Sequence, residues 1–248
     1  MNNINAVILA AGKGTRMKSD LPKVIHQCLG QPMVHYVIKA AKDAGASSCC
    51  VIVGYQGSMV KRAIYDVVDY AVQTEQLGTG HAVRCAKDYI AKGSDTLVLC
   101  GDTPLITAET LKLLIDTHKK QANGVTVLSA VLPDATGYGR IIRDAAGNFV
   151  KIVEQKDATE EEQKVTEINS GMYIFNSEAL SSALSLLTND NAAGEYYLTD
   201  TISIIKKIGL HVSAIPVTPD HLDDIRGVNT IEQLEEAEEI MRRRDHDA

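Results

Sequence analysis

An apolar run near the N-terminus, residues 6–11, breaks abruptly into a loop that contains two glycines. The run has the length of a buried strand, and the glycines mark a sharp change of structure after it. Gly12 and Gly14 can adopt a positive φ, and they lack the Cβ that would keep a ligand away from backbone N–H groups. Three cationic side chains nearby can pair with the negative charge of a phosphate, namely Lys13, Arg16 and Lys23. The segment therefore predicts a strand followed by a phosphate-binding loop.

Taken alone, this loop leaves an alternative open. It lacks the third glycine of the dinucleotide-binding fingerprint, and it lacks the Gly-Lys-Ser/Thr ending of a P-loop. An ordinary strand-to-helix turn with solvated charges would explain the same residues. Motifs elsewhere in the chain are needed to distinguish a phosphate-binding loop from an ordinary turn.

The rest of the sequence alternates apolar runs with amphipathic stretches, as α/β proteins do. Further strands are expected at residues 49–53, 70–73, 96–100, 125–132, 172–175 and 212–217. Helices are expected at residues 32–45, 59–65, around 81–85, after Thr107, and at 177–187 and 202–208. Because the early strands are continuously apolar, they predict a mostly parallel sheet with helices on both faces. Residues 141–143 and 149–153 flank a turn and predict a small antiparallel insertion.

The C-terminal segment has a different pattern from the sheet-forming part. Residues 230–248 begin with a capping box and place Ile231, Leu234, Ala237 and Met241 on one helix face. We therefore divide the chain into a main domain, 1–229, and an amphipathic helix with its tail, 230–248. The charged tail from Arg242 onward is expected to fray.

Composition excludes several classes of protein. The chain has 248 residues, 45% of them hydrophobic, so it can bury a sizeable core. Its net charge of −7 argues against nucleic-acid binding. There is no signal segment and no apolar run near the ~20 residues that span a membrane, so we expect a cytoplasmic protein without membrane contact. The five cysteines lack Cys-x-x-Cys spacing, which disfavours a disulfide framework and a zinc site.

One carboxylate stands at an informative position. Asp102 comes directly after the apolar run 96–100, and open α/β sheets bind ligands at the carboxyl ends of their strands. A role in a turn or as a helix cap is the alternative. Thr107 is the better cap for the helix that follows, which leaves Asp102 available to a ligand.

Several motifs, spread along nearly the whole chain, resemble those of bacterial N-acetylglucosamine-1-phosphate uridyltransferases, a branch of the sugar-phosphate nucleotidyltransferases. They lie at residues 9–17, 21–23, 75–81, 101–104, 136–140, 153–157, 167–171, 194–200 and 227–229. Two positions depart from the pattern: Cys100 stands where some members have Tyr, and Gln155 where many have His. The similarity covers the pyrophosphorylase half of that bifunctional family and not its acetyltransferase half.

The resemblance implies a Rossmann-like nucleotidyltransferase fold and a reaction. UTP and N-acetylglucosamine 1-phosphate would give pyrophosphate and UDP-N-acetylglucosamine, a precursor of the cell wall. The catalytic residues implied are Arg16, Lys23 and Asp102. The nucleotide would contact Leu9, Ala10, Ala11, Gly12, Lys13, Gly14, Gln73, Gln76, Gly78 and Thr79. The sugar would contact Gly139, Glu154, Asn169, Thr199 and Asn229, and Mg²⁺ would be held by Asp102 and Asn229.

The residues fit these implied roles chemically. A sugar phosphate is already an oxyanion and can attack the α-phosphorus of UTP directly, so alignment and charge neutralisation suffice. One carboxylate and one amide suit Mg²⁺, which keeps waters and phosphate oxygens as further ligands. The Gln73 amide offers a donor and an acceptor that can match the edge of uracil. His81 is not needed as a base, and structural packing is its favoured role.

Two alternatives remain at this point. The chain could act on another sugar 1-phosphate as a uridylyl- or thymidylyltransferase, or it could be a catalytically silent sugar-nucleotide sensor. Residues 75–81 with 195–200 favour the N-acetylglucosamine branch. Because no hexapeptide repeat occurs here, we expect no acetyltransferase activity and no acetyl-CoA binding. We also expect a monomer, or a weak dimer through an exposed stripe of Ile231, Leu234 and Met241.

Overall fold

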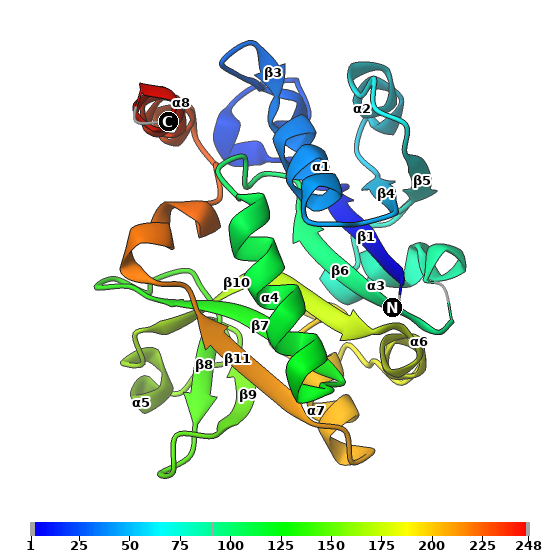
Figure 1. Ribbon diagram of the computed structural model, residues 1–248, viewed down its shortest axis with the longest axis vertical. Helices are drawn as coiled ribbons and strands as arrows, with labels where there is room; N and C mark the ends of the chain where they lie inside the picture. The colour runs from blue at the N-terminus through cyan, green and yellow to red at the C-terminus, as the bar shows by residue number, and fades with distance from the viewer. Residues whose placement is uncertain (1–2, 91, 247–248) are drawn as a thin grey trace.

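The computed structural model describes residues 3–90 and 92–246 (Figure 1). Its strands are β1 (Asn3–Ala10), β2 (Gln27–Cys28), β3 (Gln31–Pro32), β4 (Ser48–Val53), β5 (Asp69–Val72), β6 (Ser94–Cys100), β7 (Val125–Val131), β8 (Arg140–Arg143), β9 (Phe149–Val153), β10 (Glu167–Asn176) and β11 (Val212–Pro216). The α-helices are α1 (Met33–Asp43), α2 (Gly57–Ala63), α3 (Thr79–Cys85), α4 (Ala108–Gln121), α5 (Glu160–Gln163), α6 (Ser177–Ser185), α7 (Asp200–Lys207) and α8 (Ile231–His246). Short 3-10 helices are η1 (Thr15–Met17), η2 (Lys23–Ile25), η3 (Lys87–Tyr89) and η4 (Pro219–Ile225).

The main sheet has the strand order β11-β7-β10-β6-β1-β4-β5. Strands β6, β1, β4 and β5 pair in parallel, and β11 pairs in parallel with β7. Strand β10 runs antiparallel to both of its neighbours, and the hairpin β8–β9 joins the sheet beside it. The prediction of a mostly parallel sheet with a small antiparallel insertion is confirmed.

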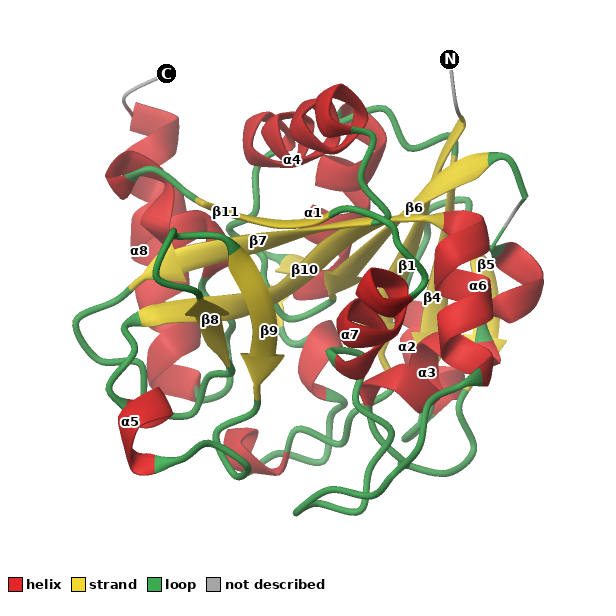
Figure 2. Ribbon diagram, turned by 90° about the horizontal axis from the view of Figure 1, so that it is seen from below, coloured by secondary structure: helices red, strands yellow, loops and turns green. Residues whose placement is uncertain are grey.

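Helices cover both faces of this sheet (Figure 2). Helices α1 and α4 lie on one face, and α3, α6 and α7 lie on the other. Each presents apolar side chains to the strands, as its sequence periodicity predicts. Thr107 caps α4 as expected, since its side chain accepts a hydrogen bond from the backbone N–H of Thr110.

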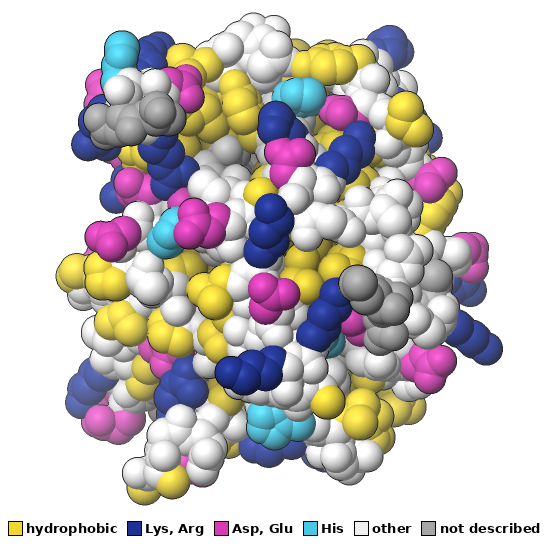
Figure 3. All heavy atoms as spheres, viewed as in Figure 1, with side chains coloured by type: hydrophobic (Ala, Val, Ile, Leu, Met, Phe, Trp, Pro, Cys, Tyr) yellow, Lys and Arg dark blue, Asp and Glu magenta, His cyan; other side chains and the backbone are white. Residues whose placement is uncertain are grey.

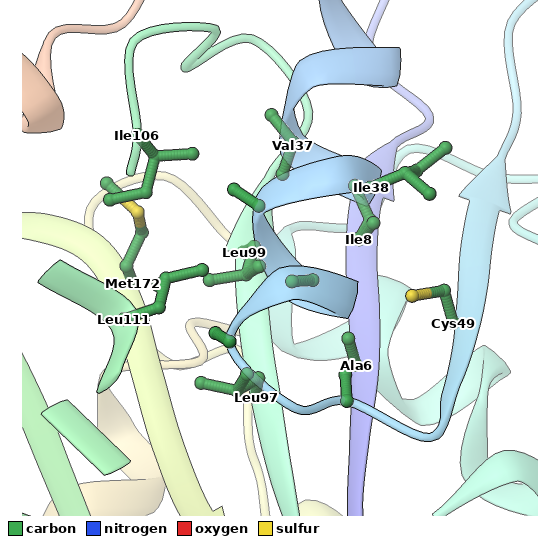
Figure 4. Close-up of a cluster of buried hydrophobic side chains, with 14 of the residues drawn as sticks. Ala6, Ile8, Val37, Ile38, Cys49, Leu97, Leu99, Ile106, Leu111 and Met172 are labelled. Atoms are coloured by element: carbon green, nitrogen blue, oxygen red, sulfur yellow. The ribbon is translucent and has the colours of Figure 1, made fainter. Parts of the chain in front are cut away.

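The largest hydrophobic cluster lies between the sheet and helices α1 and α4 (Figure 4). Ile8 of β1 and Leu99 of β6 meet Val37 and Ile38 of α1 there, and all four side chains are fully buried. Because β1 and β6 are central strands with both faces covered, their apolar residues are continuous. This packing fixes the two strands whose carboxyl ends carry the candidate site.

The ends of β1 and β6 are held in register with each other. Leu9 pairs with Cys100, and the backbone N–H of Gly101 donates to the carbonyl of Leu9 at 2.9 Å. A Cβ on residue 101 would lie 2.9 Å from that carbonyl oxygen, so a glycine is needed at this crossing. The loop after β1 and the turn that holds Asp102 therefore emerge side by side.

Helix α8 corrects two expectations. It continues to His246 instead of fraying from Arg242, because Arg244 Nη2 donates to the buried Asp224 at 2.6 Å. Residues 247 and 248 of the predicted tail lie outside the described residues. The expected exposed stripe is also wrong: Leu234 is buried, and Met241 packs against the same cluster, while Ile231 remains exposed. The apolar face of α8 contacts Met17, Met33 and Leu105 of the main body.

On the face seen in Figure 3, basic and acidic side chains are interspersed among polar and apolar atoms. A nucleic-acid-binding face would gather its basic residues into a patch. Within residues 3–90 and 92–246, no helix is long and apolar enough to cross a membrane.

Candidate active site

A cavity of about 310 Å³ opens where β1, β5 and β6 end. Most residues expected to bind the nucleotide line it: Leu9, Ala10, Ala11, Gly12, Gln73, Gln76, Gly78 and Thr79. Lys23 and Asp102 line it as well. Segments that are far apart in the sequence, the loop after β1 and the start of α3, thus form the walls of one cavity. Four further lining residues were not predicted from the sequence: Val24, Ala82, Cys100 and Glu195.

The loop after β1 has the features of an anion-binding loop. Gly14 adopts a φ of +67°, and a Cβ at this position would collide with the side chain of Lys23. Gly12 does not adopt the positive φ that a glycine allows, and a Cβ there would meet no atom within 4 Å. Within the described ranges, the backbone N–H groups of residues 12–14 donate to no acceptor. These donors are therefore available to phosphate oxygens.

Lys23 joins the two side chains expected to hold the metal. Its Nζ donates to Asp102 Oδ2 and, at 2.7 Å, to Asn229 Oδ1. Arg16 Nη2 donates to the same Asn229 oxygen at 2.8 Å. The Lys23 and Asp102 side chains are only 16% and 20% exposed, so their ion pair is screened less than a surface pair. Four residues from three distant parts of the chain therefore meet at one point.

The donor set at this point fits Mg²⁺. A carboxylate oxygen and an amide oxygen converge on one cation, the Lys23 ammonium, and both are ligand types that Mg²⁺ accepts. Among the residues that the structure describes, no three His, Cys, Asp or Glu side chains gather in a group that could hold a metal. A metal here would therefore need substrate phosphates and waters for the rest of its ligands.

Arg16 and Lys13, both predicted to bind phosphate, lie at different distances from the cluster of Lys23 and Asp102. Arg16 is exposed but is tied to Asn229. Lys13 is exposed, and its Nζ lies 5.4 Å from the centre of the Tyr55 ring, at cation–π distance. Lys13 does not line the cavity, so it is not brought together with Lys23 and Asp102.

Four residues expected to contact the sugar form a second group. Thr199 Oγ1 donates to Glu154 Oε1 at 2.9 Å. The backbone N–H of Asn169 donates to the carbonyl of Gly139 at 2.9 Å. A Cβ on Gly139 would lie 3.4 Å from Glu154 Oε2 and 3.5 Å from Asn169 Cβ. Gly139, Glu154, Asn169 and Thr199 are thus neighbours, although β8, β9, β10 and α7 carry or flank them.

Burial sets the electrostatics of this group. It raises the pKa of the Glu154 carboxyl, and the hydrogen bond from Thr199 opposes the rise. It also raises the pKa of Tyr173, whose hydroxyl accepts a hydrogen bond from Asn169 Nδ2 at 2.7 Å. Tyr173 was not predicted as a site residue, since a tyrosine within an apolar strand looks like a core residue.

Cys100 connects the sugar group to the cavity. Cys100 lines the cavity, and its Sγ donates to the carbonyl of Gly171 at 3.4 Å. The Gly171 N–H in turn donates to Asn169 Oδ1 at 3.1 Å. Burial raises the pKa of the Cys100 thiol to about 12, so this cysteine is not a nucleophile at neutral pH. The second departure from the family pattern, Gln155, accepts from the N–H of Gly137 and from Arg140.

Comparison with known proteins identifies the family. Residues 5–216 match the model of the nucleotidyl transferase family. The bifunctional protein GlmU of Caldanaerobacter subterraneus subsp. tengcongensis is 51% identical over 244 residues, which are 98% of this chain and 53% of the relative. The GlmU of Clostridioides difficile is 51% identical over 242 residues, which are 98% of this chain and 52% of the relative. The chain thus spans about half the length of these curated relatives.

A solved structure supports the fold independently. UDP-glucose pyrophosphorylase complexed with UDP-glucose has a TM-score of 0.79 and 18% identity, covering 98% of this chain and all of the other. At that identity the likeness concerns the fold alone. Because the family model covers most of the sequence and the fold agrees with it, the chain belongs to the nucleotidyl transferase family.

Proposed function

We propose that this chain transfers a uridylyl group from UTP to N-acetylglucosamine 1-phosphate, giving UDP-N-acetylglucosamine and pyrophosphate. The observation that carries the proposal is the meeting of Arg16, Lys23, Asp102 and Asn229 beside the cavity. This cluster has the charges that a triphosphate and a divalent cation require. The identity of about 50% to GlmU proteins over nearly the whole chain supports the choice of reaction.

In the proposed arrangement the nucleotide occupies the cavity and the sugar lies near Glu154. The free N–H groups of residues 12–14 and the Lys23 ammonium bind phosphate oxygens. Glu154 and Asn169 bind sugar hydroxyl and amide groups, with Thr199 and Tyr173 holding them in place. Asp102 and Asn229 would hold Mg²⁺, which when bound neutralises part of the triphosphate charge.

The chemistry requires no nucleophile from the protein. An oxygen of the sugar phosphate forms a bond to the α-phosphorus of UTP. The bond from that phosphorus to the bridging oxygen breaks, and its electron pair leaves with pyrophosphate. Lys23 and Arg16 offset the negative charge that gathers on the phosphoryl oxygens, and the cavity aligns the two reactants.

A grid of substrates tests this proposal. Pyrophosphate release is measured with UTP, CTP, ATP or dTTP, each paired with N-acetylglucosamine 1-phosphate or glucose 1-phosphate, in the presence of Mg²⁺. We expect the fastest turnover with UTP and the N-acetylated sugar. A preference for glucose 1-phosphate would assign the chain to another sugar, and no turnover of any pair would contradict the proposal.

A further inference from the structure

Gln73 lines the cavity, and its contacts fix the orientation of its side-chain amide. It follows β5, is 3% exposed, and its backbone N–H donates to the carbonyl of Val53 at 2.8 Å. Its Nε2 lies 3.1 Å from the carbonyl oxygen of Gly78. Because a backbone carbonyl can only accept, the NH₂ group and not the amide oxygen must face Gly78.

The same NH₂ group lies 3.1 Å from His81 Nδ1. With one N–H directed at Gly78, the other is directed at the imidazole, so Nδ1 must be an acceptor. A neutral imidazole with a bare Nδ1 carries its hydrogen on Nε2, which lies 4.0 Å from Cys85 Sγ. The contacts around Gln73 therefore also fix the tautomer of His81.

The amide oxygen of Gln73 is the group left for a ligand. Among the described residues nothing donates to Oε1, and Gln73 lines the cavity. This differs from the sequence-based expectation that the amide offers both a donor and an acceptor to the base. Both N–H groups are used within the protein, so Gln73 presents an acceptor alone.

We propose that His81 is a positioning residue that selects the base by locking the Gln73 amide, an inference that rests on the proposed binding of a nucleotide in this cavity. Uracil carries a hydrogen on N3 that Oε1 can accept. Cytosine has a lone pair on N3, so two acceptors would face each other and both would be unpaired. In the wild type, a flip that turns the NH₂ group toward the ligand breaks two hydrogen bonds, to Gly78 and to His81. Without His81 the same flip breaks only the bond to Gly78, so the flipped amide becomes more accessible.

Two variants separate this role from simple packing. His81→Leu keeps bulk but removes the acceptor, whereas His81→Asn places an amide oxygen near the position of Nδ1. The measurement is kcat/KM for UTP divided by kcat/KM for CTP, with the same sugar phosphate. A general loss of packing lowers both values and leaves their ratio unchanged. We expect His81→Leu to lower the ratio by about tenfold or more, the factor that one unpaired polar group produces, and His81→Asn to retain most of it.

Cys85→Ala is the matched control, since it removes the neighbour of the other ring nitrogen and leaves the Gln73 contact intact. Its ratio should equal that of the wild type. An unchanged ratio in His81→Leu, or an equal fall in Cys85→Ala, would overturn the proposal.

Two measurements do not depend on turnover. Nitrogen NMR of the wild-type protein should place the His81 ring hydrogen on Nε2, and a hydrogen on Nδ1 would refute the argument. Calorimetric titration with UTP and CTP, without sugar, should show a preference for UTP that His81→Leu reduces. If UTP is bound selectively but no sugar phosphate reacts, the proposed function fails while the role of His81 stands. If neither nucleotide binds, the role of His81 fails.

Discussion

The last turns of α8 are joined to the main body through the ion pair of Arg244 with the buried Asp224, and replacing Arg244 by Met tests the strength of this contact. Asp224 is fully buried and accepts from Thr107 Oγ1 at 2.5 Å, Thr110 Oγ1 at 2.6 Å and Arg244 Nη2 at 2.6 Å. Arg244 Nη1 also donates to the carbonyl of Leu105 at 2.8 Å. The Met side chain keeps the apolar stem of Arg244 and removes only the charge and its donors.

The size of the effect follows from the surroundings of Asp224. Removing one partner of a buried ion pair costs about 3–5 kcal/mol, because the other charge is left uncompensated. The two threonine hydroxyls remain as donors, and His221 Nδ1 lies 3.3 Å from Asp224 Oδ2. The Arg244 side chain is also 35% exposed, so the lower end of this energy range applies. We expect the free energy of unfolding to fall by about 3 kcal/mol. With an m-value of about 3 kcal/mol/M, the urea midpoint falls by about 1 M.

The assay is urea unfolding followed by circular dichroism, since the chain has no Trp for fluorescence. Arg243→Met is the matched control: Arg243 is the exposed neighbour on α8 and should change stability by less than about 0.5 kcal/mol. Adding Asp224→Asn to Arg244→Met removes the unpaired charge and should recover part of the loss. Equal midpoints for Arg244→Met and Arg243→Met would refute the reasoning.

Three further predictions concern the site itself. Asp102→Ala should leave the circular dichroism unchanged and lower turnover about a hundredfold or more, the usual cost of losing a charge contact in the transition state; near-normal Mg²⁺-dependent turnover would exclude its role. Lys23→Ala should lower kcat at least as clearly as it raises KM, and a rise in KM alone would transfer charge neutralisation to Arg16 or Lys13. Burial raises the pKa of Glu154 above its ordinary value of 4.5, so the native state retains a proton that the unfolded chain releases. The free energy of unfolding therefore falls as the pH rises from that ordinary value through the raised pKa. When the free energy of unfolding is measured in urea at several pH values, it should decline less with rising pH in Glu154→Gln than in the wild type. The same decline in both proteins would contradict a pKa of Glu154 raised by burial.

Local signals in the sequence predicted the framework of the site well. The apolar run at residues 6–11 forms a central strand, and Gly14 adopts the positive φ that its position in the loop suggested. Asp102 follows β6 at the carboxyl edge of the sheet, the position predicted from the apolar run that precedes it. These features depend on residues close together in the chain, so periodicity and turn chemistry were sufficient to find them.

The errors and omissions have two causes: side-chain contacts that have no signature in the sequence, and backbone conformations that a residue can adopt but does not. The charged residues after Arg242 gave no sign of a folded partner, so a solvated tail was predicted. In the structure Arg244 donates to Asp224, a buried carboxylate twenty positions earlier in the chain. The link from Gln73 to His81 joins a strand end to a helix and has no sequence signature of its own. Gly12 shows the reverse case, since a glycine that could adopt a positive φ does not do so.

The central claim is that bound sugar phosphate displaces pyrophosphate from UTP in a single step, without a nucleophile from the protein. The most direct test uses UTP with a sulfur at the α-phosphorus in one known configuration, together with N-acetylglucosamine 1-phosphate and Mg²⁺. We expect a UDP-N-acetylglucosamine analogue with inverted configuration at that phosphorus, formed in equal amount with pyrophosphate. Retention of configuration, or a uridylylated protein detected by mass spectrometry, would contradict it.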